Sequence, residues 1–200
     1  RLANYLLELG FYYPAVFTIR QVLTLAGMNA QTQTLAAPAY FNHFRYGLYY
    51  KDLILLFSQR VGLDPLFLWS VMRQESLFEK YANSGYAIGL MQIAPSTGQF
   101  IVENHGWPPN YSSSDLDRPI ISIGLGATYL MDQRNRFDGD LFTTLAAYNA
   151  GPEAAAIWRD LSGPDPDLFL EVVRYQETRN YVTSIYEIFA MYSRLYATGQ

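Results

Sequence analysis

The chain has 200 residues, of which 16% are charged, 16% are aromatic and 50% are hydrophobic. A soluble domain averages about 25% charged residues, so this composition is poor in charge and rich in rings, and it excludes a disordered protein. The net charge is −4 and no basic run is present, which argues against a nucleic-acid partner because phosphate binding needs a basic face.

The apolar residues are not gathered into a membrane-spanning stretch. The run at residues 53–57 is far shorter than the roughly 18 residues that span a bilayer, so we predict no transmembrane segment. Residue 1 is Arg and no signal segment opens the chain, so we expect a mature or excised piece of something longer.

Metal sites and disulfides are not indicated. Cysteine is absent, which removes disulfides, thiolate chemistry and Cys-based metal sites. The histidines are His43 and His105, which are too few and too far apart in sequence to indicate a metal site. We therefore expect neither a metal nor another cofactor, and the sequence leaves the oligomeric state unknown.

The N-terminal residues carry helical punctuation. Residues 2–9 end at Gly10, and a run that begins near Pro14 closes at Gly27, so the two are predicted to form a helical hairpin. Residues 30–39 are rich in Gln, Thr and Ala without a clear period, and we predict a linker there. Residues 1–45 are thus expected to form a short helical segment before the main domain.

Two helices are predicted next. One covers about residues 50–61 and stops at Gly62, and the pair Asp64-Pro65, a cap followed by a first-turn proline, opens another through about residue 77. Residues 78–94 contain Gly85 and Gly89 and no sustained helical period, so they should form a loop or a small strand pair.

Helix-starting residues recur through the rest of the chain. They are Pro95, Asp117, Asp140 and Pro152, which predict helices over about residues 95–106, 117–137, 140–151 and from 152 onward. A polar loop is expected over residues 108–115, and a last helix over about residues 178–196. Strands do not alternate with helices, so the predicted fold class is mostly α.

Glu75 is the first candidate for chemistry. At about 100° per residue it lies about 20° from Leu68 and 40° from Val71, so its carboxylate continues the apolar stripe of a helix that should be buried. Desolvation should raise its pKa, which would let it donate a proton to a leaving oxygen near neutral pH. The alternative is a glutamate that emerges into water or pairs with an arginine.

Four motifs follow one another in order along the chain. They are Arg73-Gln74-Glu75-Ser76 with Ser84 after it, Gly-Leu-Met-Gln-Ile-Ala-Pro at residues 89–95, Ala-Tyr-Asn-Ala-Gly-Pro at residues 147–152, and Glu-Thr-Arg-Asn-Tyr-Val at residues 177–182. Together they resemble the lytic transglycosylases of the soluble, goose-lysozyme-like family, over about residues 49–196. The resemblance implies a lysozyme-like helical domain at residues 46–200, preceded at residues 1–45 by the end of a helical repeat or superhelical region.

This resemblance also implies an activity. Members cleave the β-1,4 bond between N-acetylmuramic acid and N-acetylglucosamine in peptidoglycan. One glutamate, here Glu75, acts first as the acid and then as the base toward the muramic 6-hydroxyl, which leaves a 1,6-anhydro ring. The expected partner is the peptidoglycan glycan strand, and the expected location is extracytoplasmic: periplasm, cell wall or secreted.

Ordinary glycosidases use two carboxylates, and the sequence around Glu75 does not suggest a pair. The only acid close to it in sequence is Glu79, one turn further and beyond the predicted helix end. An attack from within the sugar needs no protein nucleophile.

The resemblance further implies the residues that bind the sugar chain. They are Ser76, Ser84, Met91, Gln92, Tyr148, Asn149, Glu177 and Tyr181. Tyr181 is expected beside Glu75, where its phenol would orient the carboxyl group. Gln92 offers both a donor and an acceptor for a sugar, and Gly89 would let the backbone approach a ligand. Ala94 replaces a methionine of many relatives, which predicts a slightly wider groove.

Structural roles remain open for several of these residues. Ser76 could be a helix-end hydroxyl, Asn149 a helix-terminus residue and Glu177 a capping acid. Tyr148 lies on a helical stripe, so its ring is expected in the core and its hydroxyl needs a partner if it is buried.

Two other functions remain open. One is a goose-type lysozyme, which would leave reducing ends, and the other is a glycan-binding module that has lost turnover.

Overall fold

The computed structural model describes residues 1–28 and 37–196. Its helices are α1 (Leu2–Glu8), α2 (Tyr12–Leu25), α4 (Ala39–Arg45), α5 (Lys51–Val61), α6 (Pro65–Ser76), α7 (Pro95–His105), α8 (Pro119–Arg136), α9 (Leu141–Ala150), α10 (Pro152–Ser162), α11 (Pro166–Val172) and α12 (Gln176–Tyr196), with a 3₁₀ turn η1 (Ser113–Asp117). The extended pairing in these ranges is limited to isolated bridges, so the mostly α fold class is confirmed. Residues 30–36 of the predicted linker lie outside the described residues.

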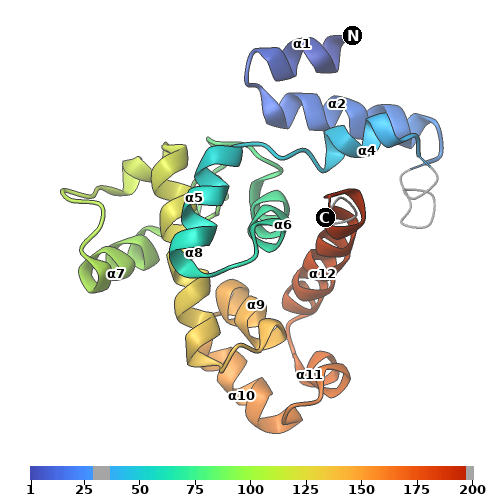
Figure 1. The fold of residues 1–200 in the computed structure, drawn as a ribbon. Helices are drawn as coiled ribbons and strands as arrows, with labels where there is room; N and C mark the ends of the chain where they lie inside the picture. The colour runs from blue at the N-terminus through green and yellow to red at the C-terminus, as the bar shows by residue number, and fades with distance from the viewer. Residues whose placement is uncertain (29–36, 197–200) are drawn as a thin grey trace.

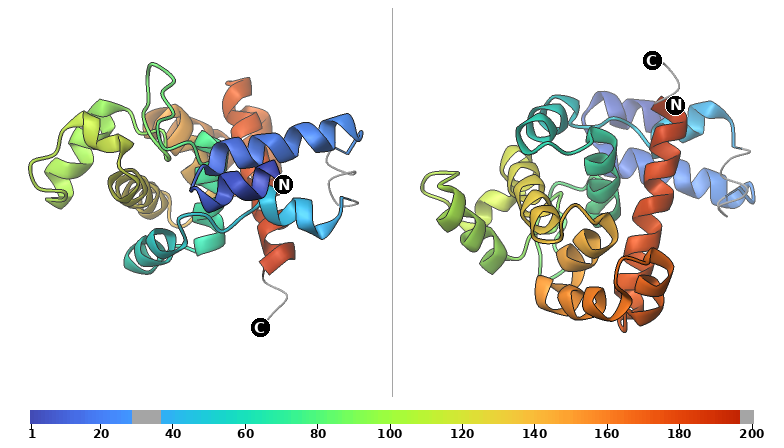
Figure 2. Two further views of the ribbon diagram at one scale, coloured as in Figure 1. Left: turned by 90° about the horizontal axis from the view of Figure 1, so that it is seen from above. Right: turned by 60° about the horizontal axis from the view of Figure 1, so that its bottom comes forward.

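Helix α6 lies inside a ring of other helices. It packs against α5 on one side and α12 on the other, while α9 contacts α8, α10 and α12 (Figure 1). The two further views in Figure 2 show α1, α2 and α4 together at one end, with the α7 region extending from the opposite side. The helix that carries Glu75 is therefore held from several directions.

Aspartates begin two of the helices as predicted. The Asp64 carboxylate accepts a hydrogen bond from the Leu66 N–H at 2.7 Å, and Asp140 accepts one from the Phe142 N–H at 3.1 Å. Each satisfies a backbone donor that the first turn of a helix leaves free.

The predicted cap at Asp117 is wrong. Asp117 ends η1, which has its own capping box between Ser112 and Asp115, and α8 begins two residues later at Pro119 with Arg118 in the cap position. Asp115 and Asp117 therefore belong to the 3₁₀ turn and not to the start of the long helix.

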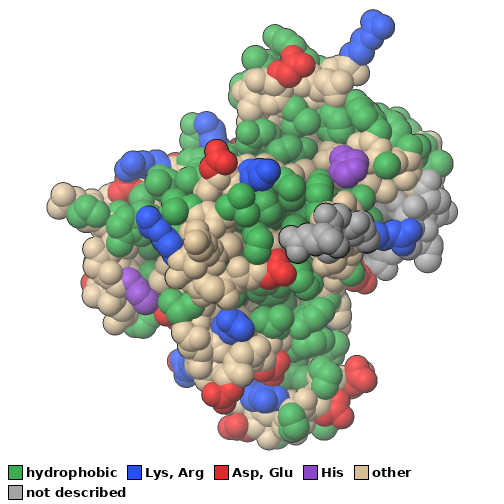
Figure 3. All heavy atoms as spheres, viewed as in Figure 1, with side chains coloured by type: hydrophobic (Ala, Val, Ile, Leu, Met, Phe, Trp, Pro, Cys, Tyr) green, Lys and Arg blue, Asp and Glu red, His purple; other side chains and the backbone are tan. Residues whose placement is uncertain are grey.

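The N-terminal helices have a small core of their own. Ala3, Ile19, Leu23, Ala37 and Phe44 are buried together there, apart from the large core around α6. Val16 of α2 is nevertheless buried in the large core, so the division into residues 1–45 and 46–200 stays a proposal. Many apolar side chains of α1 and α2 remain exposed, and Figure 3 shows hydrophobic side chains spread over this end of the molecule.

Candidate active site

The local sequence of α6 places Glu75 at the end of a buried helix. Phe67, Leu68, Trp69, Val71 and Met72 are each no more than 3% exposed. The helix stops at Leu77, whose left-handed φ of 50° turns the chain away. Glu75 therefore lies in the last turn of α6 and is partly buried.

The carboxyl group of Glu75 is held as an acid by its surroundings. Burial raises the pKa of Glu75 to about 8, and a hydrogen bond donated by the Tyr181 hydroxyl to Oε1 offsets part of that rise. No cation contributes, so the carboxyl retains its proton near neutral pH.

The arginines near Glu75 in sequence or space point elsewhere. The Arg73 Nε donates to the Arg45 carbonyl oxygen at 2.8 Å, and its guanidinium carbon lies 4.4 Å from the centroid of the Tyr46 ring. Arg179 donates to the Val173 carbonyl oxygen at 2.8 Å. The alternative in which Glu75 pairs with an arginine is therefore not realised among the described residues.

Two tyrosines accompany the glutamate. Tyr181 comes from α12 and Tyr148 from α9, and burial together with Glu75 raises the pKa of both phenols well above 10.0, so both remain neutral donors. The Tyr148 hydroxyl donates to the Met91 carbonyl oxygen at 2.8 Å. Glu75, Tyr181 and Tyr148 are thus brought together from three helices.

Met91 and Gln92 lie in the loop before α7. The Met91 side chain is fully buried and packs against Gly126, while its N–H donates to Ser122 Oγ at 3.1 Å. The Gln92 Nε2 donates to the carbonyl oxygens of Ala82 and Gly89 at 3.1 and 2.9 Å. Both residues hold the loop together, and substrate contact by either stays a prediction.

Gly89 makes its close approach to protein. Its φ is +79°, and a Cβ at this position would lie 2.1 Å from the Leu116 carbonyl oxygen and 2.8 Å from Ser122 Oγ. Packing within the fold therefore requires glycine at this position. The sequence had predicted that Gly89 lets the backbone approach a ligand, whereas its close neighbours are protein atoms.

The two serines differ in position. Ser76 is buried, donates to the Met72 carbonyl oxygen at 3.2 Å and accepts from the Phe78 N–H at 3.2 Å. Ser84 is exposed in a tight turn, where its Oγ accepts from the Ala87 N–H at 3.1 Å. Ser84 is accordingly the more accessible of the two to a ligand.

Asn149 and Glu177 lie at facing helix ends. Asn149 Oδ1 accepts a hydrogen bond from the Thr178 hydroxyl at 2.7 Å, which links the end of α9 to the start of α12. Glu177 is exposed in the first turn of α12. Their sugar contacts remain predictions.

Tyr129 of α8 was not predicted from the sequence as a residue of the site. Its ring centroid lies 5.4 Å from that of Tyr148, so the two rings pack against each other. It stands outside the four motifs, and an aromatic residue within a long apolar helix gives no signal of its own.

Within residues 1–28 and 37–196, no three His, Asp or Glu side chains lie close enough together to hold a metal ion. No helix in the described part of the chain is long and apolar enough to cross a membrane.

The packed helices, with Glu75 partly buried at the end of a buried helix, define a helical domain of the lysozyme-like class. A family model described as the transglycosylase SLT domain matches residues 52–166. The chain belongs to this family, which confirms the resemblance seen in its motifs.

Curated relatives agree with this assignment. The soluble lytic murein transglycosylase of Salmonella typhimurium is 30% identical over 151 residues, and that of Escherichia coli (strain K12) is 31% identical over 151 residues. Each alignment covers 74% of this chain and 23% of the relative. The chain thus spans about a quarter of the length of these proteins.

Solved structures share the fold over nearly the whole chain. The 70 kDa soluble lytic transglycosylase of Escherichia coli matches with a TM-score of 0.81 and 27% identity, covering 100% of this chain and 30% of that one. An inactive mutant of the lytic transglycosylase Slt from Pseudomonas aeruginosa matches with a TM-score of 0.79 and 26% identity, covering 99% and 30%.

Proposed function

We propose that this chain is the catalytic part of a peptidoglycan lytic transglycosylase, which cleaves the β-1,4 bond between N-acetylmuramic acid and N-acetylglucosamine and leaves 1,6-anhydro ends. The observation that carries the proposal is Glu75, partly buried, with a pKa raised to about 8 and a hydrogen bond from Tyr181. The activity named for the longer relatives supports it.

Glu75 would act first as the general acid. Its proton passes to the glycosidic oxygen as the bond from that oxygen to C1 of the muramic residue breaks. The resulting carboxylate is stabilised by the Tyr181 hydroxyl, which already donates to Oε1. The charge that develops on Glu75 therefore meets a donor that is in place before the reaction begins.

The same carboxylate then acts as the base. It accepts the proton of the muramic 6-hydroxyl while O6 bonds to C1, which closes the anhydro ring and restores the protonated Glu75. The reacting oxygen belongs to the same sugar, so the step needs neither a bound water nor a second carboxylate. No other carboxylate shifts the pKa of Glu75, in agreement with a single acid and base.

The glycan strand would run past the tyrosines. Tyr148, Asn149, Ser84, Gln92 and Glu177 are the proposed contacts, and neutral donors and ring faces suit an uncharged sugar backbone. A solved complex of the 70-kDa soluble lytic transglycosylase contains bulgecin A. A peptidoglycan substrate would place the protein outside the cytoplasm, in the periplasm, in the cell wall or secreted.

The test is the mass of the products released from purified sacculi. Anhydro ends are lighter by one water than the corresponding reducing ends, and we expect the lighter products. Reducing ends would show a goose-type hydrolase, and binding to sacculi without release would show a glycan-binding module; either result contradicts the proposal.

A further inference from the structure

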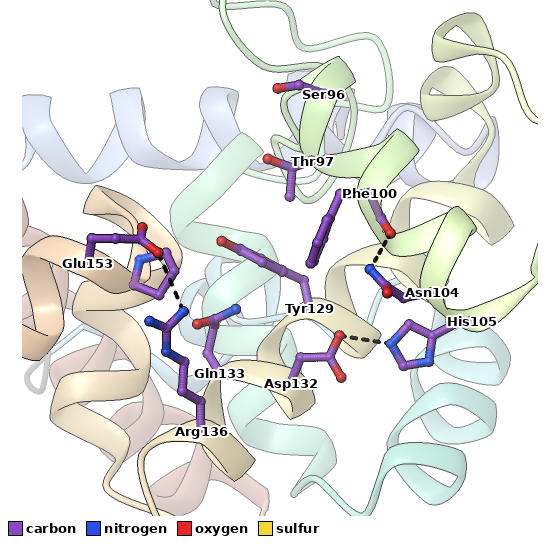
Figure 4. A pocket seen from close by; sticks show the side chains of 11 residues that line it. Ser96, Thr97, Phe100, Asn104, His105, Tyr129, Asp132, Gln133, Arg136 and Glu153 are labelled. Carbon is purple, nitrogen blue, oxygen red and sulfur yellow. Dashed lines mark hydrogen bonds and ion pairs between the residues drawn. The ribbon is translucent and has the colours of Figure 1, made fainter.

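Two series of packed aromatic rings lead toward Glu75. One begins in a pocket of about 560 Å³ between α7, α8 and the start of α10, where the rings of Phe100 and Tyr129 lie at the centre (Figure 4). The Tyr129 ring packs on Tyr148, a proposed sugar contact that interacts electrostatically with Glu75. The other series begins in the N-terminal helices and consists of residues outside the proposed substrate contacts.

This second series connects α2 to the turn that follows Glu75. The Tyr12 ring stacks on Tyr49, with centroids 4.6 Å apart and an interplanar angle of 19°. The Tyr49 ring meets Phe78 edge to face, with centroids 4.9 Å apart. Both arrangements are those that aromatic pairs favour. The first turn of α2 is therefore linked, through one intervening ring, to a residue three positions after Glu75.

The turn after Glu75 has a strained backbone. Leu77 and Phe78 have successive positive φ values of 50° and 68°, in a region that side chains other than glycine adopt at a cost. Such conformations persist only where the surrounding contacts hold them in place. Relaxation of either residue would change how α6 ends, immediately after the catalytic carboxyl group.

The contacts that hold this turn lead back to Tyr49. The Phe78 side chain is 1% exposed, and its N–H donates to Ser76 Oγ at 3.2 Å. The Tyr49 carbonyl oxygen accepts a hydrogen bond from Trp69 Nε1 at 2.7 Å, and its hydroxyl donates to the Phe44 carbonyl oxygen at 2.7 Å. Tyr49 is thus fixed at its backbone and at the tip of its ring, while Tyr12 covers one face of the ring.

The loop beyond the turn is held by other elements. A Cβ on Gly89 would lie 2.1 Å from the Leu116 carbonyl oxygen, and the Met91 N–H donates to Ser122 Oγ at 3.1 Å. These contacts attach the loop that carries Gln92 to η1 and α8. A loosened turn after α6 should therefore disturb Glu75 more than the proposed sugar contacts of the loop.

We propose that Tyr12 of the N-terminal helices is a positioning residue for Glu75, acting through the rings of Tyr49 and Phe78. Tyr12 keeps Tyr49 against Phe78, and Phe78 keeps the left-handed turn. The turn in turn keeps the Glu75 carboxyl group against the Tyr181 hydroxyl. Small misplacements of a catalytic group lower a rate steeply, by about 100-fold for 1 Å. The inference rests on the proposed function for the reaction itself.

The first experiment separates kcat from KM. The full chain is assayed on soluble peptidoglycan strands, at a temperature at which circular dichroism shows every variant to be folded. The variants are Tyr12→Ala, Tyr12→Phe, which retains the ring, and Leu23→Ala, which removes packing from the small core on the same helix. We expect Tyr12→Ala to lower kcat about tenfold and to change KM less than about twofold. Tyr12→Phe and Leu23→Ala should keep kcat within about twofold of the wild type.

Other results would overturn the inference. Equal losses of kcat in Tyr12→Ala and Leu23→Ala would show a general effect of destabilising the N-terminal helices. An unchanged kcat in Tyr12→Ala, or a loss confined to KM, would remove Tyr12 from the positioning of Glu75.

A double-mutant cycle tests the route of the effect. If Tyr12 acts by keeping Glu75 against Tyr181, its removal should matter little once the Tyr181 hydroxyl is gone. We expect Tyr12→Ala to lower the kcat of Tyr181→Phe by about twofold or less. A further tenfold loss in the double variant would contradict this route.

A titration separates this inference from the proposed function. The glutamate carboxyl carbons are labelled with ¹³C and followed by NMR against pH, and the signal of Glu75 is assigned by its absence in Glu75→Gln. A carboxylate that loses the Tyr181 donor is destabilised, so we expect the pKa of Glu75 to rise in Tyr12→Ala and to stay unchanged in Leu23→Ala. An unchanged or lowered pKa in Tyr12→Ala would overturn the positioning role. This measurement requires no turnover, so it holds even if the chain proves inactive on sacculi.

Discussion

Glu75 is protonated because its hydrogen bond and its burial act in opposite directions and burial dominates. A carboxylate that accepts a hydrogen bond is favoured in its charged form, yet the pKa still stands at about 8. The residue can thus give up a proton and take one back near neutral pH, which is what a single acid and base requires.

Tyr181→Phe tests that balance. Removing the donor destabilises the carboxylate, so we expect the pKa of Glu75 to rise further and the descending limb of the pH–rate profile to move to higher pH. The loss of a hydrogen bond to a developing charge should lower kcat about tenfold or more. The measurement is kcat against pH for the two proteins, and a limb that moves to lower pH would contradict the role given to Tyr181.

Stability should also respond to pH through Glu75. Its native pKa of about 8 lies above the ordinary 4.5, so between these values the native state holds more protons than the unfolded chain. The free energy of unfolding should therefore fall as pH rises through this window, by up to about 1.4 kcal/mol per pH unit. Glu75→Gln should lack this component in urea unfolding from pH 5 to 8. Identical slopes for the two proteins would exclude the raised pKa.

At the scale of elements, the loop before α7 depends on one glycine. Gly89→Ala would force a Cβ against the Leu116 carbonyl oxygen in addition to a positive φ, and should cost about 2 to 4 kcal/mol of stability. Gly85 has a φ of +86° and open space around it, so Gly85→Ala should cost only about 1 to 2 kcal/mol. Denaturant midpoints compare the two variants, and equal losses would show that packing at Leu116 is unimportant.

Helix ends were predictable where the chemistry is local. Asp64 and Asp140 begin their helices because a carboxylate bonds to the backbone two residues later. Helix α11 was missed although Asp165 caps it in the same way, accepting from the Asp167 N–H at 3.0 Å. Helix α4 was missed as well, since seven residues give too short a period to recognise.

The site was predictable only in part. The stripe of α6 predicts the burial of Glu75, but its contact with Tyr181 spans 106 residues and came from the resemblance of motifs. The pocket beside Tyr129 is assembled from residues on three helices, so it appears only when the chain is folded. The motif predicted that Gly89 approaches a ligand, but the atom closest to a Cβ at this position is the Leu116 carbonyl oxygen. A contact with a residue so distant in sequence cannot be predicted from the motif.

On the scale of the whole molecule, the segment between α4 and α5, which contains Tyr46 and Tyr49, is hydrogen-bonded to residues of the large core. Trp69 Nε1 donates a hydrogen bond to the Tyr49 carbonyl oxygen at 2.7 Å. The Tyr196 hydroxyl donates one to the Tyr46 carbonyl oxygen at 2.8 Å. The Tyr12 ring stacks on Tyr49 with centroids 4.6 Å apart, which ties α2 to the same segment. The two proposed parts are therefore in direct contact.

Residues 46–200 expressed alone should fold, because their large core and the anchors on Trp69 and Tyr196 are retained. Losing the packing of Tyr12 and Val16 should cost about 3 kcal/mol, which lowers the melting temperature by about 6 to 12 °C. Differential scanning calorimetry of residues 46–200 and of the full chain measures the two melting temperatures. The absence of a cooperative transition in the shorter chain would contradict the proposed division.

The central claim is that Glu75 alone supplies both the acid and the base. The most direct test is the rate at which Glu75→Gln releases muropeptides from sacculi, beside the wild type and the neighbouring Glu79→Gln. We predict a loss of about 10³-fold or more for Glu75→Gln, with a melting temperature at pH 6 at least as high as that of the wild type because the variant lacks the titrating carboxyl group, and near-normal rates for Glu79→Gln. Near-normal release by Glu75→Gln would contradict the account.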